Sequence, residues 1–159
     1  TVAKGIASGL PLSAVVASRD LMDRWAPGAH GGTYGGNAVA CAAGVATFEV
    51  MRDEDLPGNA ARIGQFLMSQ LREMQSEFPV IGDVRGMGLM IGVEFVKPDG
   101  APNGAAAQEV IRRAQERRTL LISAGTSDQV IRVIPPLVIN QQQAEEFLDV
   151  FADAVKGVS

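Results

Sequence analysis

Residues 89–96 read LMIGVEFV, and the turn-forming residues KPDG follow directly at positions 97–100. A short run of apolar and β-branched residues that ends at Pro-Asp-Gly predicts a β-strand followed by a turn. Residues 130–134, VIRVI, predict a second strand, which the consecutive prolines Pro135 and Pro136 end. Short strands separated by helical segments place this part of the chain in the α+β class.

Helical periodicity flanks both predicted strands. From Ile63, apolar residues step by 4, 4, 3 and 4 positions to Phe78, which predicts an amphipathic helix ended by Pro79. Two more helices are expected at residues 105–118 and 144–155.

The first part of the chain has a different pattern. Residues 12–17 are apolar, small or β-branched, and predict a buried strand, and residues 20–25 predict a brief helix. Asn37 is expected to cap a helix that runs to Met51. Because this helix is apolar on nearly every side, we expect it to be buried on several faces.

Charge divides the chain into two parts. Residues 1–48 carry 5 of the 32 charged side chains, so the remainder lie in residues 49–159. We therefore expect residues 1–48 to be tightly turned material from a large core, and residues 49–159 to be a smaller domain with more surface. The first residue is Thr1 and the chain begins inside a strand-and-loop region, so we expect it to be the carboxy-terminal portion of a longer protein.

The composition excludes several classes of protein. An apolar share of 47% with 20% charged residues excludes wholesale disorder, and a net charge of −4 without a basic block argues against nucleic acid as the main partner. The longest apolar run, residues 38–48, is short of the ~20 residues that span a bilayer. One cysteine, Cys41, and one histidine, His30, exclude an intrachain disulfide and leave too few ligands for a zinc centre, so no metal is expected. Without a leader pattern, we expect a cytoplasmic protein.

Lys4 is the first residue that could carry chemistry, because it is the only charged residue among positions 1–18. Apolar surroundings disfavour the ammonium form of a lysine, and the neutral amine is the form that attacks a carbonyl. The alternative is a lysine that extends its charge into solvent.

The second candidate is the glycine-rich loop HGGTYGGN at residues 30–37. Backbone N–H groups ahead of a helix start, with the hydroxyl of Thr33, could contact a phosphate. The loop has neither the Walker nor the GxGxxG order, and a simple tight turn is the alternative. His30 is expected to be a turn residue without a catalytic role.

The third candidate is Arg132, which interrupts the apolar strand at residues 130–134. An arginine held on a rigid strand can grip a carboxylate in two places. A structural ion pair with an acid elsewhere in the chain is the alternative. Arg85 is expected to order a turn by bonding carbonyl groups or Asp83.

Four blocks, in this order, resemble the class III (subgroup II) pyridoxal-phosphate aminotransferases. AKGIASGLPL at residues 3–12 resembles the lysine segment of that family. HGGTYGGN at 30–37, followed by ACAA at 40–43, resembles its glycine-rich loop and helix. IGDVRGMGLM at 81–90 is similar to its small-domain entry strand, and IRVIPPL at 131–137 to its carboxylate-binding strand. Within the family, the 4-aminobutyrate aminotransferase branch looks most similar.

The resemblance implies fold type I, an α/β domain joined to an α+β domain. Residues 1–48 would be the end of the large pyridoxal-phosphate-binding domain with its connecting helix, and residues 49–159 the small domain. Lys4 matches the lysine that forms a Schiff base with the cofactor and then moves the proton. Thr33 matches the residue that binds the cofactor phosphate across the dimer interface, and Arg132 the arginine that binds the substrate carboxylate.

The implied reaction moves an amino group from an ω-amine donor such as 4-aminobutyrate to a 2-oxo acid such as 2-oxoglutarate. The implied assembly is a homodimer or a dimer of dimers. The family usually has proline where Ala38 stands, with little effect expected. A same-fold decarboxylase or aminomutase remains an alternative. Because the family's remaining cofactor contacts precede Thr1, residues 1–159 alone should bind the cofactor poorly, as a non-catalytic folding or dimerisation fragment.

Overall fold

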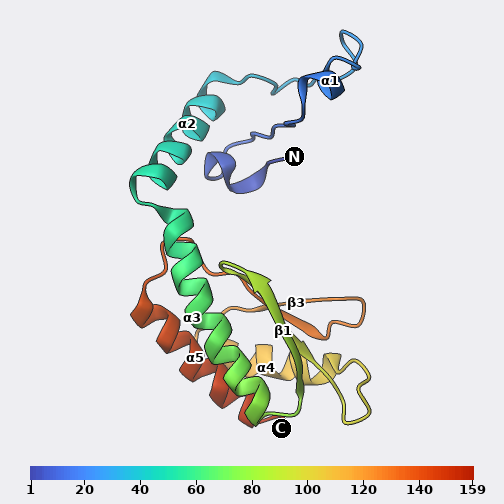
Figure 1. Cartoon of the computed structure of the whole chain (residues 1–159), viewed down its shortest axis with the longest axis vertical. Coiled ribbons are helices and arrows are strands. Elements are labelled where there is room, and N and C mark those ends of the chain that lie inside the picture. Colours follow the sequence, from blue (N-terminus) through green and yellow to red (C-terminus); the bar gives the residue numbers. More distant parts are fainter. The chain divides into compact units, whose positions relative to one another are not determined.

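The computed structural model describes all 159 residues, and the chain divides into two units, Thr1–Asp55 and Leu56–Ser159 (Figure 1). The first unit contains a 3-10 helix, a one-turn helix and a longer helix: η1 (Lys4–Ala7), α1 (Arg19–Met22) and α2 (Ala38–Asp53). Asn37 caps α2 as the sequence predicts, because its side-chain oxygen accepts a hydrogen bond from the N–H of Ala40 at 3.0 Å.

Two expectations for the first unit are wrong. Residues 12–17 form no strand, and Ala14 makes only an isolated antiparallel bridge to Val2. Within the first unit, the helix α2 is not buried on several faces, since its buried residues are Ala40 and Gly44. Apolar composition predicts that a segment has a partner surface, but it does not say that the partner lies within the same chain.

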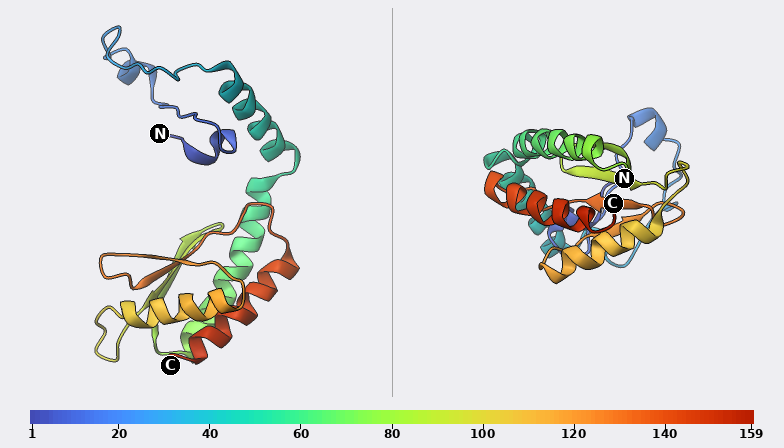
Figure 2. Two further views of the ribbon diagram at one scale, coloured as in Figure 1. Left: turned by 180° about the vertical axis from the view of Figure 1, so that it is seen from behind. Right: turned by 90° about the horizontal axis from the view of Figure 1, so that it is seen from below.

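The second unit places three helices against one face of a four-stranded antiparallel sheet (Figure 2). The sheet order is β1-β2-β4-β3. The strands are β1 (Ile81–Met87), β2 (Met90–Phe95), β3 (Ile122–Ala124) and β4 (Val130–Val133). The helices are α3 (Leu56–Glu77), α4 (Gly104–Glu116) and α5 (Gln141–Lys156). The strands expected at residues 89–96 and 130–134 and the three expected helices are therefore present.

Alternation along β2 separates the two faces of the sheet. Ile91, Val93 and Phe95 are buried in the core shared with the helices. Gly92 and the side chain of Glu94 lie on the opposite face, which no helix covers. The sheet is therefore half-buried, with one face available for other contacts.

A close backbone contact joins α3 to the turn between β1 and β2. Gly88 occupies that turn with a φ of 54°. A Cβ at Gly64 of α3 would lie 2.2 Å from the carbonyl oxygen of Gly88, so only glycine fits there. Through this contact, α3 fixes the position of the β1–β2 hairpin.

No helix in the structure combines the length and the apolar composition that a bilayer crossing needs.

Candidate functional site

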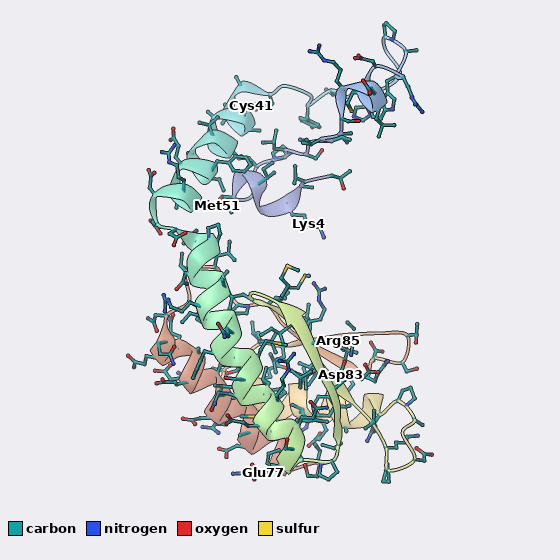
Figure 3. The ribbon with its side chains drawn as sticks, viewed as in Figure 1. Lys4, Cys41, Met51, Glu77, Asp83 and Arg85 are labelled. Atoms are coloured by element: carbon teal, nitrogen blue, oxygen red, sulfur yellow. The ribbon has the colours of Figure 1, made fainter.

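Lys4 lies at the start of η1, and its side chain is exposed (Figure 3). Its backbone has a φ of 57°, a left-handed conformation that is uncommon for residues other than glycine. Ser8, which ends η1, has a φ of 49°. Such conformations cost about 1–3 kcal/mol each and cluster at functional sites. The strained backbone therefore supports a functional role for this segment.

The first unit by itself does not supply the apolar shelter expected around Lys4. The side chain borders an open hollow beside residues 5 and 8–12, and nearby apolar residues such as Val2 and Leu10 are themselves 45% and 40% exposed. The Lys4 ammonium makes no hydrogen bond or ion pair with the chain. Desolvation of this amine would require protein surface beyond the first unit, residues 1–55.

Thr33 lies in the loop before α2, on the rim of a pocket of about 470 Å³ that residues 11–13 and 30–36 line. Two short turns shape the loop, with Gly35 N–H donating to the Gly32 carbonyl and Asn37 N–H to the Tyr34 carbonyl, both at 3.1 Å. The hydroxyl of Thr33 is exposed and has no partner in the chain. A concave loop with a free hydroxyl is compatible with a phosphate contact.

His30, the first residue of this loop, lies against Trp25, with 5.9 Å between the ring centroids. This contact is consistent with the turn role expected for the residue. The structure brings together no group of three or more His, Cys, Asp or Glu side chains that could hold a metal ion.

Arg132 belongs to the second unit, on the uncovered face of the sheet. Ile131 and Val133, which flank it on β4, are buried, whereas Arg132 is exposed. It forms no ion pair or hydrogen bond through its side chain. The structural ion pair that was the alternative for Arg132 is therefore absent from this chain, and its fork of donors is free to bind a carboxylate.

Arg85 lies on the same face and differs from Arg132 in having two acidic partners. Its Nη1 atom lies 2.7 Å from Oδ2 of Asp83 and 2.6 Å from Oε2 of Glu94 (Figure 3 labels Asp83 and Arg85 on β1). The hydrogen bonds to Asp83 and then to Glu94 raise the pKa of the Arg85 guanidinium above its ordinary value. The expected contact with Asp83 is present, but it joins residues of a strand rather than of a turn.

Sequence reasoning missed Gly92 and Glu94. In the register of the sheet, Gly92 pairs with Arg85 on one side and with Arg132 on the other. Glu94 is only 26% exposed and is bound to Arg85. The alternation of residues 89–96 could have placed both on one face, but the strand order was needed to place them beside the arginines.

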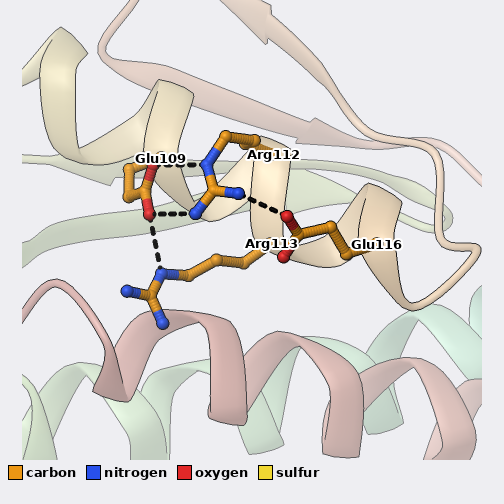
Figure 4. Close-up of polar contacts among 4 residues, drawn as sticks. All are labelled: Glu109, Arg112, Arg113 and Glu116. Atoms are coloured by element: carbon orange, nitrogen blue, oxygen red, sulfur yellow. Dashed lines mark hydrogen bonds and ion pairs between the residues drawn. The ribbon is translucent and has the colours of Figure 1, made fainter.

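A separate group of charges lies on α4 (Figure 4). Arg112 binds Glu109 at 2.6 Å and also pairs with Glu116, and Arg113 binds Glu109 at 2.9 Å. Hydrogen bonding to Arg112 is the main cause that lowers the pKa of Glu109 to about 2. These partners are three and four positions apart, so they are pairs along the surface of one helix rather than a binding site.

Comparison with known proteins covers nearly the whole chain. The family model for aminotransferase class-III matches residues 1–155. The 5-aminovalerate aminotransferase DavT of Pseudomonas putida is 46% identical, over 86% of this chain and 32% of the relative. An alanine/serine racemase of Pyrococcus horikoshii is 42% identical, over 96% of this chain and 32% of the relative. A probable 4-aminobutyrate aminotransferase of Bacillus subtilis is 38% identical, over 94% of this chain and 35% of the relative. The chain spans about a third of the length of these relatives.

Solved structures match as well. An acetylornithine aminotransferase from Elizabethkingia anophelis has a TM-score of 0.82 and 30% identity, over 97% of this chain and 39% of that one. An amine transaminase from an uncultivated Pseudomonas species was solved in its PLP-bound form. It has a TM-score of 0.74 and 30% identity, over 82% of this chain and 30% of that one. The expected fold class is therefore confirmed.

Proposed function

The chain belongs to the class-III aminotransferases, and from this premise we propose that the whole protein moves an amino group from an ω-amine donor to a 2-oxo acid. A 4-aminobutyrate-like donor and 2-oxoglutarate are the proposed substrates. The family match over residues 1–155, which include Lys4, Thr33 and Arg132, carries the proposal. Relatives named for 5-aminovalerate and 4-aminobutyrate support an ω-amino acid as the donor.

The proposed cofactor is pyridoxal phosphate, and the residues present fit it. The Lys4 amine is free of protein partners and can react with an aldehyde, and Thr33 with its loop offers donors to a phosphate. When bound, this cofactor withdraws electrons from the carbon of the substrate that loses its proton. We propose that Lys4 Nζ takes up and returns that proton, and that Arg132 orients the substrate by its carboxylate.

Borohydride reduction of the full-length protein with its cofactor, followed by peptide mapping, tests the role of Lys4. The chain has two other lysines, Lys97 and Lys156, which serve as internal controls. We expect the pyridoxyl adduct on Lys4. An adduct on any lysine other than Lys4 in the full-length protein would contradict the assignment.

The role of Arg132 is tested by Arg132→Ala in the full-length protein. We expect binding of the 2-oxo acid to weaken by about 2–5 kcal/mol, because the carboxylate loses a charge-assisted partner. Isothermal titration with 2-oxoglutarate measures this change. Arg72→Ala, on the exposed side of α3, is the control, and equal affinities in the two variants would leave Arg132 without a substrate role.

A second reaction of the same fold is kept in view, because a racemase is 42% identical to the chain. A racemase, decarboxylase or aminomutase would use a single amino acid without any 2-oxo acid. Product analysis with one amino acid and no acceptor separates these reactions from transamination. Turnover under that condition would contradict the proposed transfer.

Homodimer formation and a cytoplasmic location are parts of the same proposal. Thr33 would then bind the cofactor phosphate in the active site of the second subunit. Light scattering on the full-length protein measures the assembly. For residues 1–159 alone, we propose a fragment that binds the cofactor weakly, and an absorbance scan after adding pyridoxal phosphate tests it.

A further inference from the structure

Two arginines face each other across a glycine on the uncovered face of the sheet. Arg85 on β1 and Arg132 on β4 both pair with Gly92 of β2. Directly paired residues of antiparallel strands point to the same face, so the two guanidinium groups extend from one row. Gly92 has no side chain, and the atom nearest to where its Cβ would lie is Cγ1 of Val130, at 3.3 Å.

Glu94 lies next to this row and is diagonal to both arginines. It is two positions beyond Gly92 on β2, where its direct partners are Asp83 and Val130. Diagonal neighbours in a sheet are about 7–8 Å apart, a distance that long side chains span. The bond between Arg85 and Glu94 is itself such a diagonal contact.

Glu94 is held at both carboxylate oxygens, and the shorter bond is the one to Arg85. Its Oε2 atom accepts from Arg85 Nη1 at 2.6 Å, and its Oε1 atom accepts a longer hydrogen bond of 3.4 Å from Gln129 Nε2. Arg85 is held in turn by Asp83 at 2.7 Å. Arg132, at the same diagonal offset from Glu94, has no acidic partner.

An acid in this position is a competitor for any carboxylate that Arg132 binds. If Glu94 were released from Arg85, its carboxylate could reach Arg132 from the diagonal position and occupy the same donors. Asp83 is separated from Arg132 by the whole of β2, so it is a much weaker competitor. The observed ion pairs leave the donors of Arg132 unoccupied.

We propose that Arg85 is a positioning residue that holds Glu94 away from Arg132 and so keeps Arg132 free for the carboxylate of the 2-oxo acid. This inference rests on the proposed function, because it needs Arg132 as the carboxylate ligand. Arg85 itself touches neither substrate nor cofactor. Its two acidic partners more than offset its own positive charge, so that Arg132 is the one arginine of the row without an acidic partner.

Steady-state kinetics of the full-length protein with 2-oxoglutarate test the proposal. We expect Arg85→Gln to raise KM for the 2-oxo acid about two- to fivefold, the range that exposed ion pairs span, with kcat nearly unchanged. The second substitution in R85Q/E94Q removes the released competitor, so we expect KM to return to the wild-type value. Arg85→Lys retains the charge and should raise KM less than Arg85→Gln.

A matched double variant separates competition from a general loss of positive charge. R85Q/D83N has the same net charge as R85Q/E94Q but leaves Glu94 in place. We expect its KM to stay raised. Equal KM values in the two double variants would overturn the proposal, because simple electrostatics would then explain the change.

Three further outcomes are decisive. A crystal structure of the Arg85→Gln protein should show the Glu94 carboxylate on the Arg132 guanidinium, and Glu94 left in its original position would overturn the proposal. An unfolded Arg85→Gln protein, with Arg85→Met also unfolded, would make Arg85 a structural residue and overturn it as well. Failure of the proposed function is distinct: the wild type would then not transaminate, or Arg132→Ala would leave KM unchanged.

Discussion

The two units of the chain use their apolar residues in opposite ways. The second unit buries side chains from all three helices and from β1, β2 and β4 in one cluster, including Ile63, Leu67, Phe95 and Phe151 at 0% exposure. The buried apolar side chains of the first unit are only Ala7 and Ala40. Its large apolar residues remain outside, among them Trp25 at 48% and Phe48 at 57% exposure.

This difference separates a unit that is complete in itself from one that needs a partner. An antiparallel sheet with helices on one face closes a core within the second unit. The first unit has a similar apolar content but no second layer, so its apolar side chains form the kind of exposed surface that marks interaction sites. Lys4 and Thr33 lie in this incomplete unit, and Arg132 lies in the complete one.

The largest expected effect is on folding of the separated units. Residues 56–159 alone should melt cooperatively, with an unfolding free energy of roughly 5–15 kcal/mol, because their core is internal. Residues 1–55 alone should show no cooperative transition. Circular dichroism during heating measures both, and a gradual melt of residues 56–159 would remove the contrast.

The next effect is a cavity in the core of the second unit. Phe151→Ala should lower the unfolding free energy by about 3–5 kcal/mol, because a fully buried aromatic ring is lost. The matched change in the first unit is Phe48→Ala, at an exposed position. Phe48→Ala should change the unfolding free energy of the main transition by only about 0.5 kcal/mol. Urea unfolding measures both, and similar losses would mean that Phe48 contributes to a shared core.

A smaller effect is expected at the contact between α3 and the β1–β2 turn. Gly64→Ala should destabilise the second unit by about 1–3 kcal/mol, since its Cβ would meet the backbone of Gly88. Gly31→Ala, with no atom within 4 Å of the added Cβ, is the control and should be nearly neutral. A neutral Gly64→Ala, measured by thermal unfolding, would show that the turn can shift at little cost.

The smallest effect concerns the ion pairs of α4. The folded-state pKa of Glu109, about 2, is below its ordinary value of 4.5, so Glu109 stabilises the fold above pH 4.5. That contribution decreases as the pH falls from 4.5 towards 2. Glu109→Gln should therefore lower the melting temperature slightly at pH 7 and by much less near pH 2. Glu73→Gln is the control, because Glu73 pairs with Gln70 rather than with an arginine, and a pH-independent difference would contradict the linkage.

Local patterns predicted much of the second unit. The apolar steps from Ile63 to Phe78 define the buried side of α3, where Ile63, Leu67 and Leu71 are buried. The turn at residues 97–100 follows β2 as expected, since Gly100 N–H donates to the Lys97 carbonyl. β3 has only three residues and no distinct pattern of its own, so the sequence did not reveal it. In the first unit, residues 12–17 have strand-like composition but no neighbouring strand to form a ladder.

The sequence by itself determined the cap at Asn37, the periodic helices, strands β2 and β4, and the four blocks that carry the family resemblance. These features depend on residues close together in the chain, where backbone geometry and side-chain spacing act directly. Only the tertiary structure decided that Arg85 binds Glu94, that Arg132 has no acidic partner, and that Lys4 is exposed. Such properties depend on which strands become neighbours and which surfaces are covered, and the spacing of residues along one segment does not contain that information.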